Sequence, residues 1–409
     1  MWATEFLFDY KMTMIRLLSI LTLIISVNTF AADPFKTAKS AIKSKNGLEN
    51  AEKSLTEYAT NLQTPPTQRA KAFNMAAQVA DRIREVENEK MYLKQQFDTV
   101  RYFNALLRVY QHTMSCDSVE AEPDERGRLR SSFGKDNRRR RLDVAANLLQ
   151  GGKWMMKHGR YGEAFDMFDV YDRADSANKT VDSNNRRLPV WAAKCALLAG
   201  RMHGARHYAT RAIAMRDELA EMIGYKSQAE LALGDTTAWL KTLGEGVEKF
   251  PANRSFFLAL GGYHRKRGER NVALALTDRV VAACPDTIIY REARCQLLYE
   301  MGEWARCIEA GDFILGRNAN NIAANFYTGA SLVSRAEELA KAMPLDTKSE
   351  NYRKERQEVQ STYQRARKAL ENFRRMRAED VGLWAPLLYK VYYALNMGKE
   401  LNEVEQYIK

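Results

Sequence analysis

The chain has 409 residues, 45% of them apolar and 28% charged, which is typical of a folded soluble protein and excludes global disorder. This length exceeds one small core and predicts two or three domains or an elongated array. Only 9 prolines and 22 glycines are present, too few for an all-β protein with many turns. The formal net charge is +12.

The first predicted element is a secretory signal peptide over residues 1–31. A basic segment precedes an apolar run, 17–27, and small residues follow at a predicted cleavage site after Ala31. The run is shorter than the roughly 20 residues of a membrane span, so no transmembrane span is predicted in the mature chain. An uncleaved anchor is the alternative. Residues 1–11 contain acidic side chains, which indicates a true start further along the chain.

Export predicts a periplasmic or secreted mature chain. No cysteine stands near Ala31, so a lipid-anchored form has no attachment point. The next region, 33–115, is predicted to form one or two irregular helix pairs. Its proline pair, followed by Thr67, predicts a break with a helix cap. Residues 116–137 are acidic and then basic, with one proline and two glycines, and are predicted to form a charged loop.

Residues 138–409 carry an internal repeat. Small and large apolar residues recur at fixed places around marker glycines, each expected to end the first helix of a pair. The markers stand 34 residues apart, apart from the first, which precedes the second by 41: Gly159, Gly200, Gly234, Gly268 and Gly302. A 34-residue period of helix pairs resembles the tetratricopeptide-repeat family. The resemblance implies an all-α, right-handed superhelix, a solenoid of antiparallel pairs, with degenerate pairs in 33–115.

The repeat is interrupted near its end. A charged insertion, 337–362, predicts either one pair with an elongated first helix or a loop near Pro344. Another first helix is predicted over 383–396, stopped by Gly398, and 401–409 is predicted to be a capping helix. The whole chain resembles exported tetratricopeptide-repeat proteins of Gram-negative bacteria, which implies a fold and a compartment but no activity.

The resemblance also implies a binding surface, because members of this family bind ligands in a concave groove formed by fixed places of the first helices. The predicted groove residues are Lys153, Met156, Lys157, Arg187, Lys194, Arg265, Lys266, Tyr299 and Phe326. Cations toward the N-terminal end predict a protein or peptide partner of acidic character. Val190 and Lys194 do not match the family's carboxylate clamp, so no such clamp is predicted. Plain solvated surface is the alternative reading of these residues.

No catalytic residue, metal site or cofactor is predicted. The sequence has neither a Gly-x-Ser-x-Gly elbow nor a phosphate-binding loop. His203 and His207 are four residues apart and could share a helix face, but a zinc site needs a third ligand, so they are interpreted as surface histidines. A glycan-acting or hydrolytic enzyme with scattered residues is the less favoured class.

Cys295 and Cys307 occupy the two places of one repeat where the paired helices pass closest. Their Cα atoms are expected within the ~4.4–6.8 Å that a disulfide requires, and an oxidising compartment would permit the bond. The alternative is that each cysteine fills a position for a small apolar side chain.

Two basic stretches predict a second function. Residues 126–141 hold eight cations against one carboxylate, and residues 351–377 hold nine against three. The densest run is Arg138, Arg139, Arg140 and Arg141. Export and the lack of interleaved aromatics argue against nucleic acid and favour anionic lipid or glycan of the cell envelope. Solvated helix faces with exchanging ion pairs are the alternative.

Overall fold

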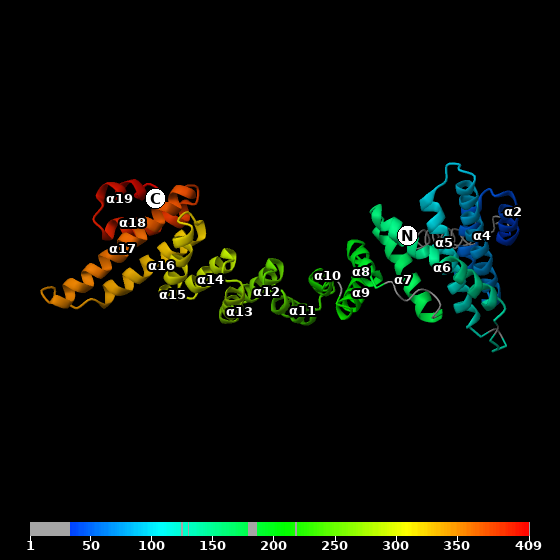
Figure 1. The fold of residues 1–409 in the computed structure, drawn as a ribbon, viewed down its shortest axis with the longest axis horizontal. Coiled ribbons are helices and arrows are strands. Elements are labelled where there is room, and N and C mark those ends of the chain that lie inside the picture. Colours follow the sequence, from blue (N-terminus) through cyan, green and yellow to red (C-terminus); the bar gives the residue numbers. More distant parts are fainter. Residues whose placement is uncertain (1–32, 124–125, 130, 179–185, 217–218, 409) are drawn as a thin grey trace, which may run out of the picture. The chain divides into compact units, whose positions relative to one another are not determined.

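The computed structural model describes residues 33–123, 126–129, 131–178, 186–216 and 219–408, whose regular secondary structure is entirely α-helical. Contacts divide the chain into two compact units, Met1–Glu218 and Leu219–Lys409 (Figure 1). We describe each unit by itself. The predicted signal peptide, 1–31, lies outside the described residues. Among those described, every helix is too short or too polar to cross a bilayer.

The first unit begins with four helices in the region where irregular pairs are predicted. The helices are α2 (Pro34–Ser44), α3 (Leu48–Thr60), α4 (Pro66–Tyr92) and α5 (Thr99–Glu120). The long helix α4 packs against both short helices and against α5, and alanines at its centre are fully buried. The prediction of a cap at Thr67 is wrong. Pro65 takes the cap position and Pro66 the first helical position, where the missing N–H leaves no bond unmade.

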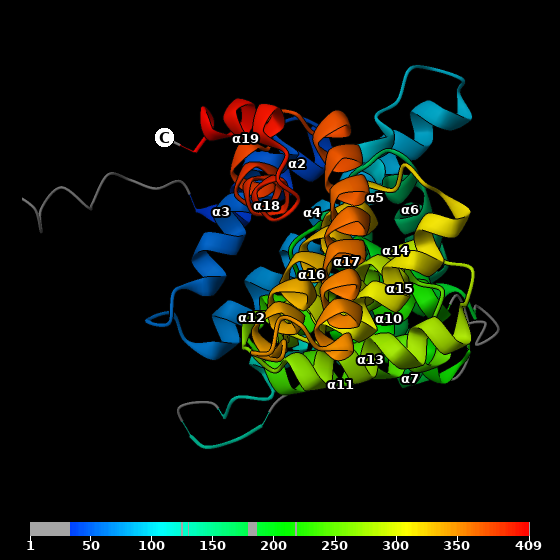
Figure 2. The same ribbon diagram turned by 90° about the vertical axis from the view of Figure 1, so that its left-hand side faces the viewer.

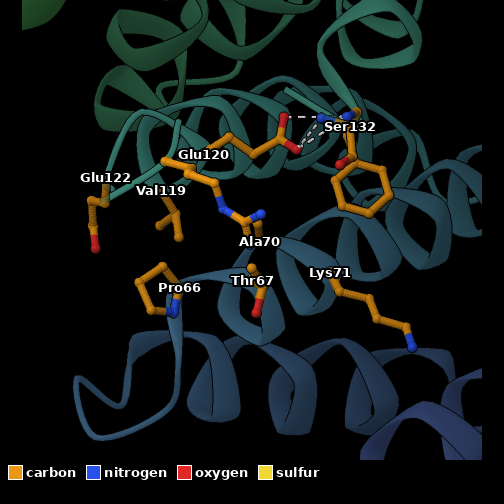
Figure 3. Close-up of a pocket in the computed structure, with 10 residues that line it drawn as sticks. Pro66, Thr67, Ala70, Lys71, Val119, Glu120, Glu122 and Ser132 are labelled. Carbon is orange, nitrogen blue, oxygen red and sulfur yellow. Dashed lines mark hydrogen bonds between the residues drawn. The ribbon is translucent and has the colours of Figure 1, made fainter. Parts of the chain in front are cut away.

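The charged loop is shorter than the predicted 116–137. Cys116 lies inside α5, and α6 (Gly134–Lys157) already begins before the arginine run. Glu120 ends α5 and fastens the loop, because its carboxylate accepts the backbone N–H groups of Ser132 at 2.6 Å and Phe133 at 3.1 Å (Figure 3). The charge pattern and the turn residues indicated a loop. They did not indicate the hydrogen bonds of Glu120, which hold the two ends of the loop together, so α5 and α6 extend into the predicted loop.

The 34-residue repeat forms antiparallel helix pairs in both units, as predicted. The pairs are α6 with α7 (Tyr161–Asn178), α8 (Leu188–Leu198) with α9 (Met202–Ala214), α10 (Leu219–Ala232) with α11 (Thr236–Lys249), α12 (Arg254–Lys266) with α13 (Arg270–Ala283), and α14 (Ile288–Glu300) with α15 (Trp304–Arg317). All five marker glycines lie between the helices of a pair and have φ of 74–77°. Each therefore ends a first helix in the left-handed conformation that glycine adopts without strain.

Gly268→Ala should isolate this backbone requirement, because no atom lies within 4 Å of the added Cβ. We expect a loss of about 1 kcal/mol in the free energy of unfolding, from the left-handed conformation alone. The matched control, Gly262→Ala in the middle of α12, also has open space but a helical backbone, and should stabilise by up to about 1 kcal/mol. Urea unfolding followed by circular dichroism measures both changes, and equal changes would contradict the assignment.

Paired helices approach most closely at small residues. A Cβ on Gly152 would lie 2.5 Å from a ring carbon of Phe168, and one on Gly329 would lie 2.7 Å from Leu370. The repeat pattern predicted that each of these glycines faces a small residue of the second helix, Ala164 or Ala366. Instead each glycine meets the large residue four positions later. Small and large residues thus interlock between the two helices, which explains why glycine is used there.

The predicted insertion, 337–362, is part of two long antiparallel helices, α16 (Ile322–Ala342) and α17 (Glu350–Met376), which lie side by side (Figures 1 and 2). Both alternatives hold in part, because the first helix is elongated and Pro344 lies in the connection. α18 (Val381–Ala394) and α19 (Gly398–Glu405) follow. The prediction that Gly398 stops a helix is wrong. Asn396 takes the positive φ of 54°, which asparagine tolerates, and Gly398 begins α19.

Candidate functional site

The predicted groove residues of the first unit lie on its first helices, α6 and α8. The Lys153 Nζ stands 4.7 Å from the centre of the Trp191 ring, a cation–π contact. Lys157 and Lys194 are exposed, and none of the three lysines pairs with a carboxylate of the described residues. Met156 is half-buried and Arg187 is exposed. We call these five predicted residues the lysine face.

Val190 does not belong to the lysine face. The family pattern places it in the groove, yet it is only 4% exposed. It lies in the first turn of α8, whose described side chains are mostly apolar, so it is held in the core. Leu198, at the other end of α8, is 53% exposed and contributes apolar surface.

In the second unit the predicted groove residues lie on α12, α14 and α16. The Arg265 guanidinium of α12 donates to Glu300 of α14 through Nε at 2.9 Å and Nη2 at 2.6 Å. These hydrogen bonds raise the pKa of Arg265. The ring of Tyr299 lies 6.0 Å from that of Phe326 on α16. The structure therefore brings Tyr299 and Phe326 together, while Glu300 neutralises Arg265. Lys266 is exposed, with no carboxylate partner among the described residues.

Phe326 also borders an open cavity of about 590 Å³, which we call the α16 cavity. Side chains of α14, α16, α17 and α18 surround it, together with the asparagine-rich turn 318–321. The sequence pattern did not predict this cavity, because α17 and α18 reach it across the long insertion. The aromatic residue Phe326, a few residues after an asparagine-rich turn, was the signal available in the sequence.

The pocket in Figure 3 is smaller, about 140 Å³, and lies between α4, α5 and the charged loop. Its acidic side chains are already engaged. Glu120 holds the loop, and Glu122 pairs with Arg69 at 3.0 Å. The acidic side chains that line this pocket therefore hold the loop against α4 and α5.

Among the described residues, Cys116, Asp117 and Glu120 form the one group of three potential metal ligands, with donor atoms within 4.8 Å. Asp117 accepts from Asn137 at 2.6 Å and pairs with Arg141 at 2.7 Å. Burial raises the pKa of the Cys116 thiol to about 11, which keeps it protonated at neutral pH. Through Asp117, this group therefore links α5 to α6. His203 and His207 are not part of it.

Cys295 and Cys307 are both fully buried and lie in contact, with free thiols. The Cys307 Sγ donates to the backbone oxygen of Cys295 at 3.3 Å. The hydrogen bond from Cys307 and burial raise the pKa of the Cys295 thiol. The two predicted places therefore do meet across the helix pair.

We expect these two thiols to form a disulfide when the chain matures in an oxidising compartment. Protein purified without reductant and then unfolded should react with a thiol reagent at three cysteines, and at five after reduction. Five reactive thiols before reduction would contradict the disulfide and leave the cysteines as small core residues.

Part of the positive charge of the basic stretches is neutralised inside the chain. In the described part of 126–141, Arg139 pairs with Asp136, Arg141 pairs with Asp117, and Arg140 donates to Asn74, whereas Arg138 has no carboxylate partner among the described residues. The stretch 351–377 likewise forms ion pairs, and their cations are Lys354, Arg365, Arg367, Arg374 and Arg377. These pairs reduce the charge available to an anionic surface.

The glycine-ended pairs at a 34-residue spacing decide the fold. The chain has the tetratricopeptide-repeat fold. No family model and no curated protein matches the sequence. Solved structures of this fold are similar at low identity. A TPR repeats protein from Bacteroides fragilis is 16% identical over 62% of this chain and 98% of its own, with a TM-score of 0.31.

Two further solved structures illustrate the likeness. A TPR protein from Thermus thermophilus is 21% identical, over 46% of this chain and 99% of its own, with a TM-score of 0.25. The TPR2AB domain of yeast Sti1, solved in a complex with pHSP90, is 12% identical, over 61% of this chain and 98% of its own, with a TM-score of 0.23. At these identities the likeness concerns the fold alone. The chain is a helical repeat protein.

Proposed function

We propose that the chain is an exported, non-catalytic scaffold that binds a protein or peptide partner along the first helices of its repeats. The observation that carries the proposal is the lysine face. Lys153, Lys157 and Lys194 project from consecutive first helices without carboxylate partners among the described residues. Lys153 also lies over the ring of Trp191, and three lysines on neighbouring first helices favour an acidic segment of a partner.

Apolar surface accompanies this charge. Leu198 in the first unit and Leu258 in the second are 53% and 45% exposed on first helices. Exposed leucines suit a peptide that is anchored by apolar contact, while the lysines steer it by charge. The residue pattern of 1–31 supports export, and we propose the periplasm or cell envelope as the place of binding.

Capture from a detergent-solubilised cell envelope tests the proposal. The chain from residue 33 onward serves as bait, with washes at low salt and at about 0.3 M salt, where charge interactions are short-ranged. We expect a defined protein that survives the salt wash, because apolar contacts hold it. Recovery of lipid or glycan alone, lost at 0.3 M salt, would instead assign binding to the basic stretches 126–141 and 351–377.

A further inference from the structure

We propose that the α16 cavity receives a lysine or arginine side chain from an extended segment of the partner. The proposal rests on the proposed function and names the chemistry that one part of the binding surface selects. The α16 cavity is proposed to bind a cation, whereas the lysine face is proposed to bind an acidic segment. The two surfaces would therefore bind different parts of a partner.

The walls of the cavity suit a long aliphatic stem. The ring of Phe326 lies 5.1 Å from that of Phe373 and 5.2 Å from that of Tyr327, and all three residues line the cavity. Ile322 and Leu383 flank them and are 43% and 48% exposed. Lysine and arginine lay their methylene groups along such surfaces, and aromatic faces attract the charged end.

One carboxylate at the cavity lacks a cation. Glu292 of α14 is half-buried, accepts from Asn321 Nδ2 at 2.6 Å, and forms no ion pair with a described residue. The other charged lining residues, Arg377 and Asp380, pair with each other at 2.9 Å. Partial burial of a carboxylate without a counter-ion costs free energy, and a bound cation would offset that cost.

The carboxylate is also held in place. Asn321 is 8% exposed, and its Oδ1 accepts the backbone N–H of Ala324 at 2.9 Å, which caps α16. Because the same side chain donates to Glu292, the carboxylate is positioned before any ligand arrives. An anionic guest would instead meet the negative charge of Glu292. The geometry therefore favours a cation with an apolar stem over an acidic or neutral polar group.

Selection from a library of random peptides displayed on phage tests the proposal on the full chain. Three baits are compared: the unaltered protein, Glu292→Gln and Glu309→Gln. Glutamine at 292 keeps an oxygen for Asn321 and removes only the charge. Glu309 is an exposed carboxylate on α15 that does not line the cavity, so it controls for the net charge.

We expect the unaltered protein and Glu309→Gln to enrich peptides with lysine or arginine beside an apolar residue. The Glu292→Gln bait should lose that enrichment. An enriched peptide should bind about tenfold more weakly to Glu292→Gln by fluorescence anisotropy, and Phe326→Ala should also weaken it.

The outcomes separate the two proposals. Enriched peptides without a basic residue, or basic peptides that bind Glu292→Gln equally well, would overturn the cavity assignment and leave the scaffold proposal standing. Failure of the unaltered protein to enrich any peptide would overturn the cavity assignment, while capture from the envelope would decide the scaffold proposal separately.

Discussion

Reversing the charge of Lys153, Lys157 and Lys194 to glutamate together is expected to weaken binding of the captured partner by at least about 100-fold. Each substitution replaces an attraction to an acidic segment with a repulsion, and about 1 kcal/mol at each position gives a factor of this size. The thermal unfolding midpoint should change little, because none of these lysines forms an ion pair with a described residue. The lost contact of Lys153 with Trp191 is worth only about 0.5–1 kcal/mol.

The matched control reverses three lysines of the same unit that lie on α2: Lys36, Lys39 and Lys43. They are exposed, and the change in net charge is identical. Their reversal should leave affinity within about threefold at 0.15 M salt, where screening limits distant charges. Equal loss in both variants would show that net charge alone governs binding, and unchanged affinity in both would exclude the lysine face.

Gly152→Ala is expected to destabilise the first unit by about 2–3 kcal/mol. The added Cβ would lie 2.5 and 2.7 Å from two ring carbons of Phe168, whose side chain is fully buried. Alanine normally stabilises a helix interior by up to about 1 kcal/mol relative to glycine, so packing is expected to reverse the usual sign. Urea unfolding monitored by circular dichroism measures the change.

Two further variants identify the cause. Gly162→Ala, where no atom lies within 4 Å of the new Cβ, should change stability by less than about 1 kcal/mol. Adding Phe168→Leu to Gly152→Ala should cost less than the two single changes together, because the smaller side chain makes room. Strict additivity would mean that the steric conflict is not the source of the loss.

The repeat could be predicted from sequence because its signals are local. A left-handed backbone conformation favours glycine at a single position, so it can be recognised in the sequence. All five marker glycines have this conformation. Errors arose where two residues could serve one role. Asn396 precedes Gly398 and supplies the left-handed residue, and Pro65 with Pro66 starts α4 without help from Thr67.

The candidate site was less accessible to prediction. The helical periodicity of the first helices was enough to predict that Tyr299 and Phe326 lie on one surface. The neutralisation of Arg265 by Glu300 depends on two helices that are separated by a full repeat. The α16 cavity requires α17 and α18 to return past the insertion, which local patterns do not specify.

The central claim is that partners bind the first helices and not the second helices of the repeats. Leu258 on α12 and Val272 on α13 are 45% and 49% exposed, so they are a pair matched in accessibility. A photo-crosslinking amino acid at each position, in the cells that produce the protein, would test the claim most directly. We predict a discrete partner adduct from position 258 and none from 272. Adducts from 272 alone, or equally from both, would contradict the account.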